Sequence, residues 1–386
     1  MKVLMLTSSY PHRMGDWRGG FVRELGLALM EQGLDVEVAA PNPGTPPEPD
    51  EAGPRVRWLP ALLKADGRAF HGFGIEANLR ADPLAALTLP RFLLAFAAEA
   101  TVLTPFADVI VAHWLVPMGA VGAMLARFSH KPLVVVAHSA PSGLTALPPL
   151  SLAVREVVRA ASLVVCVCDR VRDLVLRTVG KDLATKVRTL PLGVAPRPRV
   201  AATNLHGLRL LFVGRLVGMK GADLLIRACA GLEGVRVTFV GDGPEASRLR
   251  SLAASLEAPV RFVGECDHEQ VLALMSSHDA LVVPSRRTLF GREEGLPRVA
   301  VEAWASGLPV IASDSGGIAG AAGDSALIFR SGDMLDLRRQ IVRLRDDEGL
   351  RQRLRAGSAG LGDAMAWHNV APGWVELLAS VARRCP

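Results

Sequence analysis

Residues 208–222 have the sequence LRLLFVGRLVGMKGA, and this stretch decides the fold. The apolar run Leu208–Val213 predicts a strand that is buried on both faces, and Gly214 ends it. The glycine-rich turn that follows leads into a helical pattern beginning near Ala222. A buried strand, a turn and a helix form the first part of a βαβ unit, so we expect a parallel sheet with helices on both faces.

The same alternation of apolar runs and helical patterns fills the chain on both sides of this stretch. Two such series predict an α/β protein of two doubly wound, Rossmann-like domains. A Pro-rich segment, residues 191–199, separates the series and predicts a linker, which gives domains 1–195 and 196–362. The expected strands are Val3–Leu6, Val36–Ala39, Val109–Ala112, Leu133–Val136, Leu163–Val167 and Val187–Leu190, then Leu208–Val213, Val235–Val240, Val260–Val263, Ala280–Val283, Val310–Ala312 and Leu327–Phe329.

Composition narrows the classes of partner and compartment. The formal net charge of +6 favours anionic partners, but the arginines are scattered, which argues against nucleic acid. The five cysteines lie in apolar runs without zinc-site spacing, so we expect core cysteines and a cytoplasmic protein. The apolar segment around Leu84–Ala98 contains Pro90 and Arg91 and is shorter than the ~20 residues that span a bilayer. We therefore expect a protein that is soluble or lies on a membrane surface.

The strongest chemical signal is EGLPRVAVE at residues 294–302, in which seven residues separate two glutamates. Glu294 follows a predicted strand, Pro297 suits the first turn of a helix, and Glu302 lies inside that helix. The backbone N–H groups of Gly295, Leu296 and their neighbours would be unsatisfied helix-start donors, which bind phosphate oxygens. One carboxylate could then hold sugar hydroxyls and the other a ribose. The alternative is an ordinary capped helix with solvated glutamates.

Two cations follow the first strand of the second domain. Arg215 and Lys220 flank the turn that leads into the helix near Ala222, and cations beside a helix N-terminus favour a diphosphate. They would also stabilise a leaving nucleoside diphosphate without a metal ion. No two aspartates one residue apart occur in the sequence, so we expect neither the carboxylate pair of metal-dependent sugar transfer nor a metal. The alternative is two solvated turn cations.

In the first domain, glycines and histidines follow predicted strands. Gly19 and Gly20 open a helix after the first strand and permit close approach to an anion, although an ordinary loop would also contain them. His138 could hydrogen-bond the transferring sugar or orient an acceptor, or could be a satisfied loop histidine. His113 could face an acceptor together with Arg18, or could bond only backbone. The Gly-x-Gly-x-x-Gly pattern of a nicotinamide-dependent oxidoreductase is missing here.

With these motifs the chain resembles the family 4 retaining glycosyltransferases of the GT-B fold over nearly its whole length. The resemblance also includes Thr7–Pro11, Gly241–Pro244 and Pro284–Ser285. It implies two Rossmann-like domains facing across a cleft, an acceptor-side first domain, a nucleotide-sugar-binding second domain, and a helix in residues 363–386 that returns to the first domain. It also implies front-face transfer, in which the leaving phosphate accepts the acceptor's proton, and no cofactor other than the nucleotide-sugar substrate.

The resemblance assigns roles to the residues already named. The acceptor is expected to be a saccharide or lipid-linked saccharide, and the donor a UDP- or GDP-linked hexose. Residues implied to bind or act on the donor are Arg215 and Lys220 at the diphosphate, Glu294 with Gly295, Leu296 and Pro297 at the sugar, Glu302 at the ribose, Val263 and Gly264 at the base, Gly19 and Gly20 at the diphosphate, and His138 beside the sugar.

The chain also departs from the family pattern. Ser139–Pro141 replaces the usual Gly-Ser-Asp after His138, which leaves the sugar or acceptor contacts there open. The loop Arg286–Glu293 is longer and more basic than the family minimum, as in members that build exopolysaccharide or lipid-linked oligosaccharide. The alternatives are a sugar-nucleotide epimerase of the same fold, a glycosyltransferase acting on a small natural product, and a non-catalytic nucleotide-sugar binder.

A segment that mixes cations with apolar residues suggests a membrane contact. It begins at Arg55–Lys64 and continues to Arg68, Phe70 and Phe73. Such a segment could lie on an anionic membrane and receive a lipid-linked acceptor. An ordinary helix that buries its apolar face is the alternative.

Overall fold

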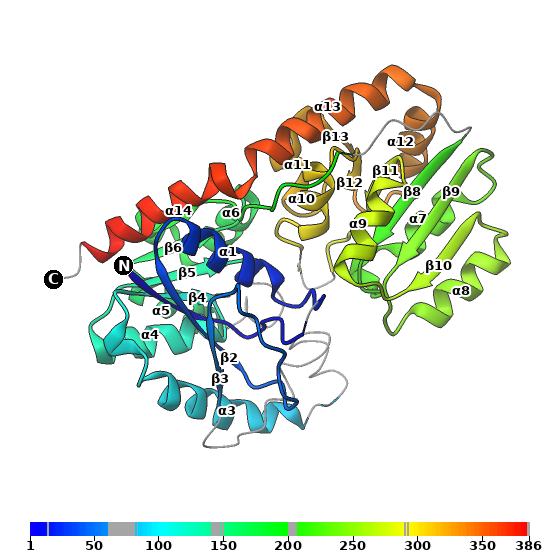
Figure 1. The fold of residues 1–386 in the computed structure, drawn as a ribbon. Helices are drawn as coiled ribbons and strands as arrows, with labels where there is room; N and C mark the ends of the chain where they lie inside the picture. Colours follow the sequence, from blue (N-terminus) through cyan, green and yellow to red (C-terminus); the bar gives the residue numbers. More distant parts are fainter. Residues whose placement is uncertain are drawn as a thin grey trace. The chain divides into compact units, whose positions relative to one another are not determined.

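The structure is a computed structural model, and it describes residues 1–13, 15–60, 82, 84–139, 148, 150–199, 207–288, 291 and 293–383. The chain divides into two compact units (Figure 1). Unit 1 contains residues 1–167, 172–192 and 370–386, and unit 2 contains residues 168–171 and 193–369. The chain therefore passes from one unit to the other at Leu192 and returns at Val370.

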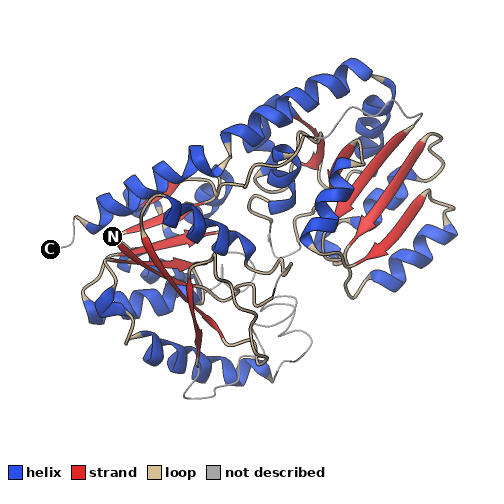
Figure 2. Ribbon diagram, in the orientation of Figure 1, coloured by secondary structure: helices blue, strands red, loops and turns tan. Residues whose placement is uncertain are grey.

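Unit 1 is built on a seven-stranded sheet with the order β3-β2-β1-β4-β5-β6-β7. Every neighbouring pair in this sheet is parallel. Parallel neighbours need crossover connections, and helices supply them (Figure 2), except between β2 and β3, which a loop of residues 42–54 joins. The strands are β1 (Lys2–Leu6), β2 (Asp35–Pro41), β3 (Arg55–Leu59), β4 (Val109–His113), β5 (Leu133–Ala137), β6 (Leu163–Cys166) and β7 (Val187–Thr189).

The helices of unit 1 follow the strands in the expected alternation. They are α1 (Gly20–Glu31), α3 (Ala85–Ala100), α4 (Met118–Ser129), α5 (Leu150–Ala160) and α6 (Asp169–Val179), with short 3-10 turns η2 (Thr104–Phe106) and η4 (Lys181–Lys186). The first three residues of α6 are counted with unit 2. From Val370 onward α14 (Trp367–Ala382) belongs to unit 1, where the Trp374 indole N–H donates to the Pro191 carbonyl at 2.9 Å.

Strand β3 corrects one prediction. The segment beginning at Arg55 was expected as a helix or a membrane-lying stretch, but Arg55–Leu59 pairs in parallel with β2 at the edge of the sheet. The reason is a period of two, since Arg55 and Arg57 are exposed while Val56 and Trp58 are half-buried. Residues 61–81, with Lys64, Arg68, Phe70 and Phe73, lie outside the described residues.

Unit 2 is built on a six-stranded, all-parallel sheet with the order β10-β9-β8-β11-β12-β13. The strands are β8 (Leu208–Val213), β9 (Val235–Val240), β10 (Val260–Gly264), β11 (Ala280–Val283), β12 (Val310–Ser313) and β13 (Ala326–Phe329). The helices are η5 (Gly218–Lys220), α7 (Ala222–Cys229), α8 (Ala246–Ser255), α9 (His268–Ser276), α10 (Arg298–Ala305), α11 (Ile318–Ala322), η6 (Gly323–Ser325), α12 (Met334–Asp346) and α13 (Glu348–Ala364). The predicted fold of two doubly wound parallel sheets is confirmed.

The cores of both units form where apolar strands meet apolar helix faces. In unit 2 the rings of Phe212 and Phe239 lie 5.0 Å apart, and Phe262 stacks on the outer side of Phe239 at 5.0 Å. Of the predicted core cysteines, Cys166, Cys168 and Cys229 are buried free thiols, Cys266 is a half-buried free thiol, and Cys385 lies outside the described residues. Among the described residues, no helix combines the length and the apolar character needed to cross a membrane.

Candidate functional site

The centre of the candidate site in unit 2 is the side chain of Glu294. Lys220, at the end of the η5 turn after β8, donates from Nζ to Glu294 Oε1. Ser285, two residues after β11, donates from Oγ to Glu294 Oε2. The side chains of Lys220 and Glu294 are only 15% and 12% exposed. The carboxyl ends of two neighbouring strands therefore bring together groups that lie 74 residues apart in the chain.

The charges around Glu294 decide its protonation. Burial alone would raise the pKa of Glu294, but Lys220, the Ser285 hydroxyl and Arg215 together lower it below its usual value. Burial lowers the pKa of Arg215, and the charge of Glu294 opposes this effect. One carboxylate thus faces two cations, and the cluster has an excess of positive charge. A site of this kind attracts an anion such as a diphosphate.

Glycines allow the backbone to turn tightly around these cations. Gly221 has φ +68°, and a Cβ there would overlap the Pro284 carbonyl oxygen after β11. Gly241 has φ +122°, and a Cβ there would overlap the Gly214 carbonyl oxygen. The Gly241 N–H donates to the Gly264 carbonyl at 2.7 Å, which ties the ends of β9 and β10 together. The predicted base-binding residues Val263 and Gly264 are half-buried at this end of β10.

Helix α10 begins next to this cluster. Pro297, which was predicted in the first turn, is the N-cap residue of α10, and no side chain caps the helix start. The turn after β12 holds the preceding loop, because the Gly317 N–H donates to the Gly295 carbonyl at 2.7 Å. A Cβ on Gly316 would lie 2.7 Å from the Glu294 carbonyl oxygen. The start of α10 therefore keeps backbone donors that an anion can bind.

Glu302 lies on α10 and is 7% exposed, so the alternative of solvated glutamates is wrong for both Glu294 and Glu302. Arg298, one turn earlier on the same helix, approaches Glu302 at 3.4 Å. Arg298 also donates to the Gly193 carbonyl at 2.5 Å. A buried carboxylate held by a cation can accept further hydrogen bonds from ligand hydroxyls.

Sequence reasoning missed the role of Glu293, the residue before Glu294. Glu293 is buried and receives two hydrogen bonds from Arg170, at 2.8 and 2.7 Å, and an ion pair from Arg287 at 2.5 Å. Both arginines belong to unit 2 with it. Burial would raise the pKa of Glu293, but the two arginines lower it. This clamp fixes the backbone that carries Glu294, and the basic loop Arg286–Glu293 was its only sequence signal.

In unit 1 the two predicted histidines contact each other directly. His113 ends β4 and His138 follows β5, and His113 Nδ1 lies 2.9 Å from His138 Nε2 with the rings stacked at 14°. The alternative that His113 bonds only backbone is therefore wrong. Phe21 and Trp114 pack against His138, with ring centroids at 4.6 and 5.0 Å.

The histidine pair is electrically neutral. Burial lowers the pKa of His113 to about 3, and burial together with the adjacent His113 lowers the pKa of His138 well below its usual value. One ring therefore donates the single N–H between them to the other. His113 Nε2 is buried and has no hydrogen-bond partner among the described atoms. The next residue, Trp114, has φ +69°, which is strained for a bulky side chain.

The predicted glycine loop of unit 1 divides into a constrained and an unconstrained position. Gly19 has φ +69°, and a Cβ there would overlap the Ser9 carbonyl oxygen, so the turn requires glycine. Gly20 begins α1, and a Cβ there would meet nothing within 4 Å. The predicted acceptor residue Arg18 donates to Asp16 at 2.8 Å within the same loop.

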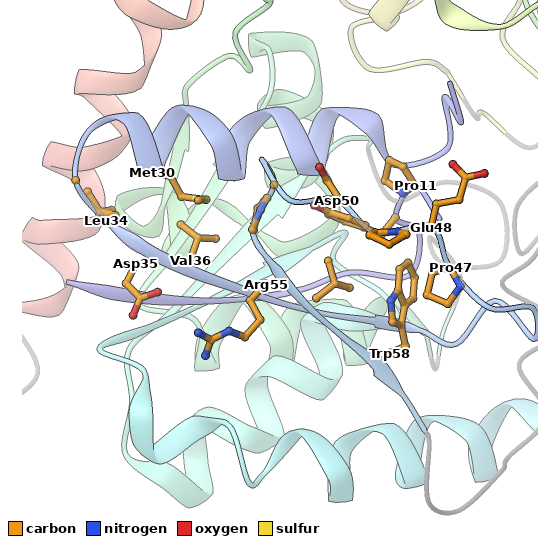
Figure 3. A pocket seen from close by; sticks show the side chains of 16 residues that line it. Pro11, Met30, Leu34, Asp35, Val36, Pro47, Glu48, Asp50, Arg55 and Trp58 are labelled. Atoms are coloured by element: carbon orange, nitrogen blue, oxygen red, sulfur yellow. The ribbon is translucent and has the colours of Figure 1, made fainter. Parts of the chain in front are cut away.

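Unit 1 also contains a pocket of 740 Å³ between α1, β2, β3 and the loop after β2 (Figure 3). Trp58 and Glu48 lie at one end, Leu34 and Asp35 at the other, and Arg55 between them. None of the residues predicted for the candidate site lines this pocket.

Two family descriptions match the chain in tandem. "Glycosyltransferase Family 4" matches residues 19–197, and "Glycosyl transferases group 1" matches residues 199–359. A relative described as D-inositol 3-phosphate glycosyltransferase 1, from Catenulispora acidiphila, is 32% identical over 95% of this chain and 91% of its own length. A glycogen synthase from Mycobacterium tuberculosis is 28% identical over 99% of this chain and 95% of its own length.

Solved structures share the fold. The sucrose-phosphate synthase of Thermosynechococcus elongatus has a TM-score of 0.79 at 22% identity and covers 99% of both chains. HepE from Anabaena, solved in complex with UDP, has a TM-score of 0.72 at 19% identity, covering 98% of this chain and 100% of that one. Together with the two tandem matches and the two parallel sheets, these likenesses place the chain among the family 4 glycosyltransferases of the GT-B fold.

Proposed function

We propose that this glycosyltransferase moves a hexosyl group, with retention of configuration and without a metal ion, from a UDP- or GDP-linked donor to a saccharide or lipid-linked saccharide. The observation that carries the proposal is the cluster of Lys220, Arg215 and Glu294 beside the uncapped start of α10. HepE, which has the same fold, was solved with UDP-glucose, and this supports a nucleotide-sugar donor.

In the proposed reaction unit 2 binds the donor. Lys220 and Arg215 neutralise the diphosphate, and the start of α10 donates backbone N–H groups to it. Each donor or cation placed where charge develops would contribute about 3 kcal/mol to transition-state stabilisation. Glu294 accepts hydrogen bonds from the sugar hydroxyls, because a carboxylate that binds Lys220 and Ser285 still has free lone pairs. Glu302 would accept from the ribose.

The transfer exchanges one bond to the anomeric carbon for another. The bond from the anomeric carbon to the β-phosphate oxygen breaks, and the bond to the acceptor hydroxyl oxygen forms on the same face. The acceptor proton passes to the leaving phosphate oxygen, so no protein base is needed. We assign the acceptor to unit 1, where the neutral His138 offers a ring nitrogen to the sugar or the acceptor.

Donor binding is tested by thermal unfolding with UDP, GDP and their hexose conjugates. A nucleotide at a hundred times its Kd stabilises the folded state by about 2.7 kcal/mol. We expect this shift for one base and not the other, and we expect Lys220→Ala and Arg215→Ala to abolish it. Arg339→Ala, an exposed cation on α12, is the matched control and should keep the full shift. A shift that survives both Lys220→Ala and Arg215→Ala would refute the assignment.

Activity is tested by following donor consumption with and without saccharide acceptors. Retention predicts an α-linked product from an α-linked donor, which the anomeric proton coupling in NMR reports. Full turnover in the presence of a chelator is expected. Donor conversion to another sugar nucleotide without acceptor would favour the epimerase alternative, and binding without turnover would favour the non-catalytic one.

A further inference from the structure

Helix α3 of unit 1 exposes apolar side chains on its outer face. Its inner face buries Phe92 and Phe96, as expected for a helix packed against β3 and α4 (Figure 1). On the outer face, however, Leu87 is 77% exposed and Leu94 is 65% exposed. These two positions are seven residues apart, two turns of helix, so they lie on one side.

The apolar surface continues beyond the helix. Leu84 and Val102 flank α3, Phe106 lies in η2, and Phe128 lies near the end of α4, which packs against both α3 and η2. We call this surface the α3 stripe, and its exposed members are Leu84, Leu87, Leu94, Val102, Phe106 and Phe128. Exposed apolar side chains that gather on neighbouring elements in this way indicate an interaction surface.

Helix α5 also exposes two leucines, Leu150 and Leu152, whereas α12 shows a different pattern. Helix α12 exposes Arg330 at its approach and Arg339 on its outer face, both paired with Asp336, and only Leu335 is a large exposed apolar residue there. A solvated helix face is normally charged in this way. The outer face of α3, with Leu87 and Leu94, thus differs from the charged outer face of α12.

The charges around the stripe select its partner. Arg91 is the one ionisable side chain on the outer face between Leu84 and Val102, and it is exposed. The helix's carboxylate, Glu99, is half-buried and lies about 120° around the helix from the centre of that face. If a second copy of the chain covered the stripe, each Arg91 would be removed from water, and the outer face of α3 between Leu84 and Val102 offers no carboxylate to pair with it, which is unfavourable.

An anionic membrane satisfies this arrangement. Arg91 can extend its long side chain to lipid phosphates while the neighbouring leucines contact the acyl region. The exposed Arg127 and the half-buried Lys131 flank Phe128 at the other end of the stripe and would meet the same phosphates. We propose that the α3 stripe is a docking surface on which unit 1 lies flat on a membrane containing anionic lipid.

This docking site differs from the segment that sequence reasoning chose, whose first residues form the edge strand β3. It requires no transmembrane helix. The docking proposal goes beyond the proposed function, and its test needs neither donor nor acceptor. A negative result for membrane docking would therefore not contradict the proposed sugar transfer, and the converse also holds.

The test is flotation of the full chain with vesicles of phosphatidylcholine alone or mixed with phosphatidylglycerol. We expect binding to the mixed vesicles. Leu87→Glu should lower the partition coefficient at least about tenfold, because the free energy gained by moving the leucine side chain out of water is lost. Leu335→Glu, with a leucine that is 64% exposed in unit 2, is the matched control and should bind as wild type does. Arg91→Ala should lower binding to the mixed vesicles about fivefold, and Arg91→Lys should restore it.

Four results would overturn the proposal. The wild-type chain fails to float with the mixed vesicles, or Leu87→Glu and Leu335→Glu reduce binding equally. Alternatively, sedimentation shows a dimer that Leu87→Glu converts to a monomer, which assigns the stripe to a second copy. Thermal unfolding of Leu87→Glu provides the folding control, since substitution on an exposed face should leave Tm within a few degrees of wild type. A fall typical of a core substitution would mean that the chain itself covers the stripe, and would also overturn the proposal.

Discussion

Replacing Lys220 by methionine should destabilise unit 2 strongly, even without any ligand. The substitution keeps most of the side-chain volume but leaves the Glu294 carboxylate, 12% exposed, without its direct ion-pair partner. Removing one partner of a buried pair costs about 3–5 kcal/mol. Because Ser285 still donates to Glu294 and some solvent reaches it, we expect the lower end, about 3 kcal/mol.

Replacing Glu294 instead of Lys220 should lower the free energy of unfolding by less. Glu294→Gln keeps the shape and an acceptor for Ser285, and the flexible Lys220 side chain can turn toward water, so we expect about 1 kcal/mol. The double variant removes both charges and should cost about 2 kcal/mol, which is less than the sum of the single changes. Denaturant unfolding of the four proteins measures this cycle, and Lys181→Met, on an exposed turn of unit 1, is the control for the loss of a lysine.

The same pair predicts a pH dependence. The pKa of Glu294 is lowered in the folded state, so its stabilising contribution is complete above the unfolded value of about 4.5 and is lost as the pH falls through the folded pKa. The advantage of wild type over Glu294→Gln should therefore shrink in acid. A cost below about 1 kcal/mol for Lys220→Met, or an advantage independent of pH, would refute this account of the pair.

Three further predictions concern unit 1. His113→Asn keeps an amide N–H near the position of Nδ1 and should preserve transfer. His113→Gln displaces this group and should lower kcat at least about tenfold with little change in KM. Equal effects of the two variants would show that His113 does not position His138. Because the pKa values of both histidines are lowered in the folded state, unit 1 should lose stability as the pH falls below about 6.5, which unfolding at successive pH values measures; stability independent of pH there would contradict the buried neutral pair. Gly19→Ala should destabilise unit 1 by about 2 kcal/mol or more, since the turn needs a left-handed residue and has no room for Cβ, while Gly20→Ala should be neutral in the same melting experiment; equal Tm values for the two variants would contradict this.

The sheets could be predicted from the sequence because their strands are buried on both faces. Runs such as Leu210–Val213 and Leu133–Val136 are continuously apolar, and the structure places both in strands. The edge strand Arg55–Leu59 was missed because only one of its faces is covered, so charged and apolar residues alternate and the run resembles an amphipathic segment. The sequence therefore predicted a strand correctly where both of its faces are buried.

The sequence predicted which site residues lie near the ends of strands, but not which of their side chains contact one another. Parallel topology brings Lys220 and Glu294 to one edge, yet their direct contact depends on side-chain placement across 74 residues of chain. The contact between His113 and His138 also follows from pairing of β4 with β5, which sequence patterns do not specify. Glu293 was overlooked because an acid in a basic loop usually indicates a solvated residue, whereas here Arg170 and Arg287 bury it.

The return of the chain to unit 1 at Val370 has a consequence for biosynthesis. Trp374 and Leu378 are fully buried, so unit 1, whose strands are made before unit 2, lacks part of its interior until these two residues emerge from the ribosome. Unit 2, nearly continuous from Gly193 to Asn369, can complete earlier. Removal of the segment that contains Trp374 and Leu378 would therefore destabilise unit 1. During synthesis, the incomplete surface of unit 1 would stay exposed to chaperones until this segment emerges.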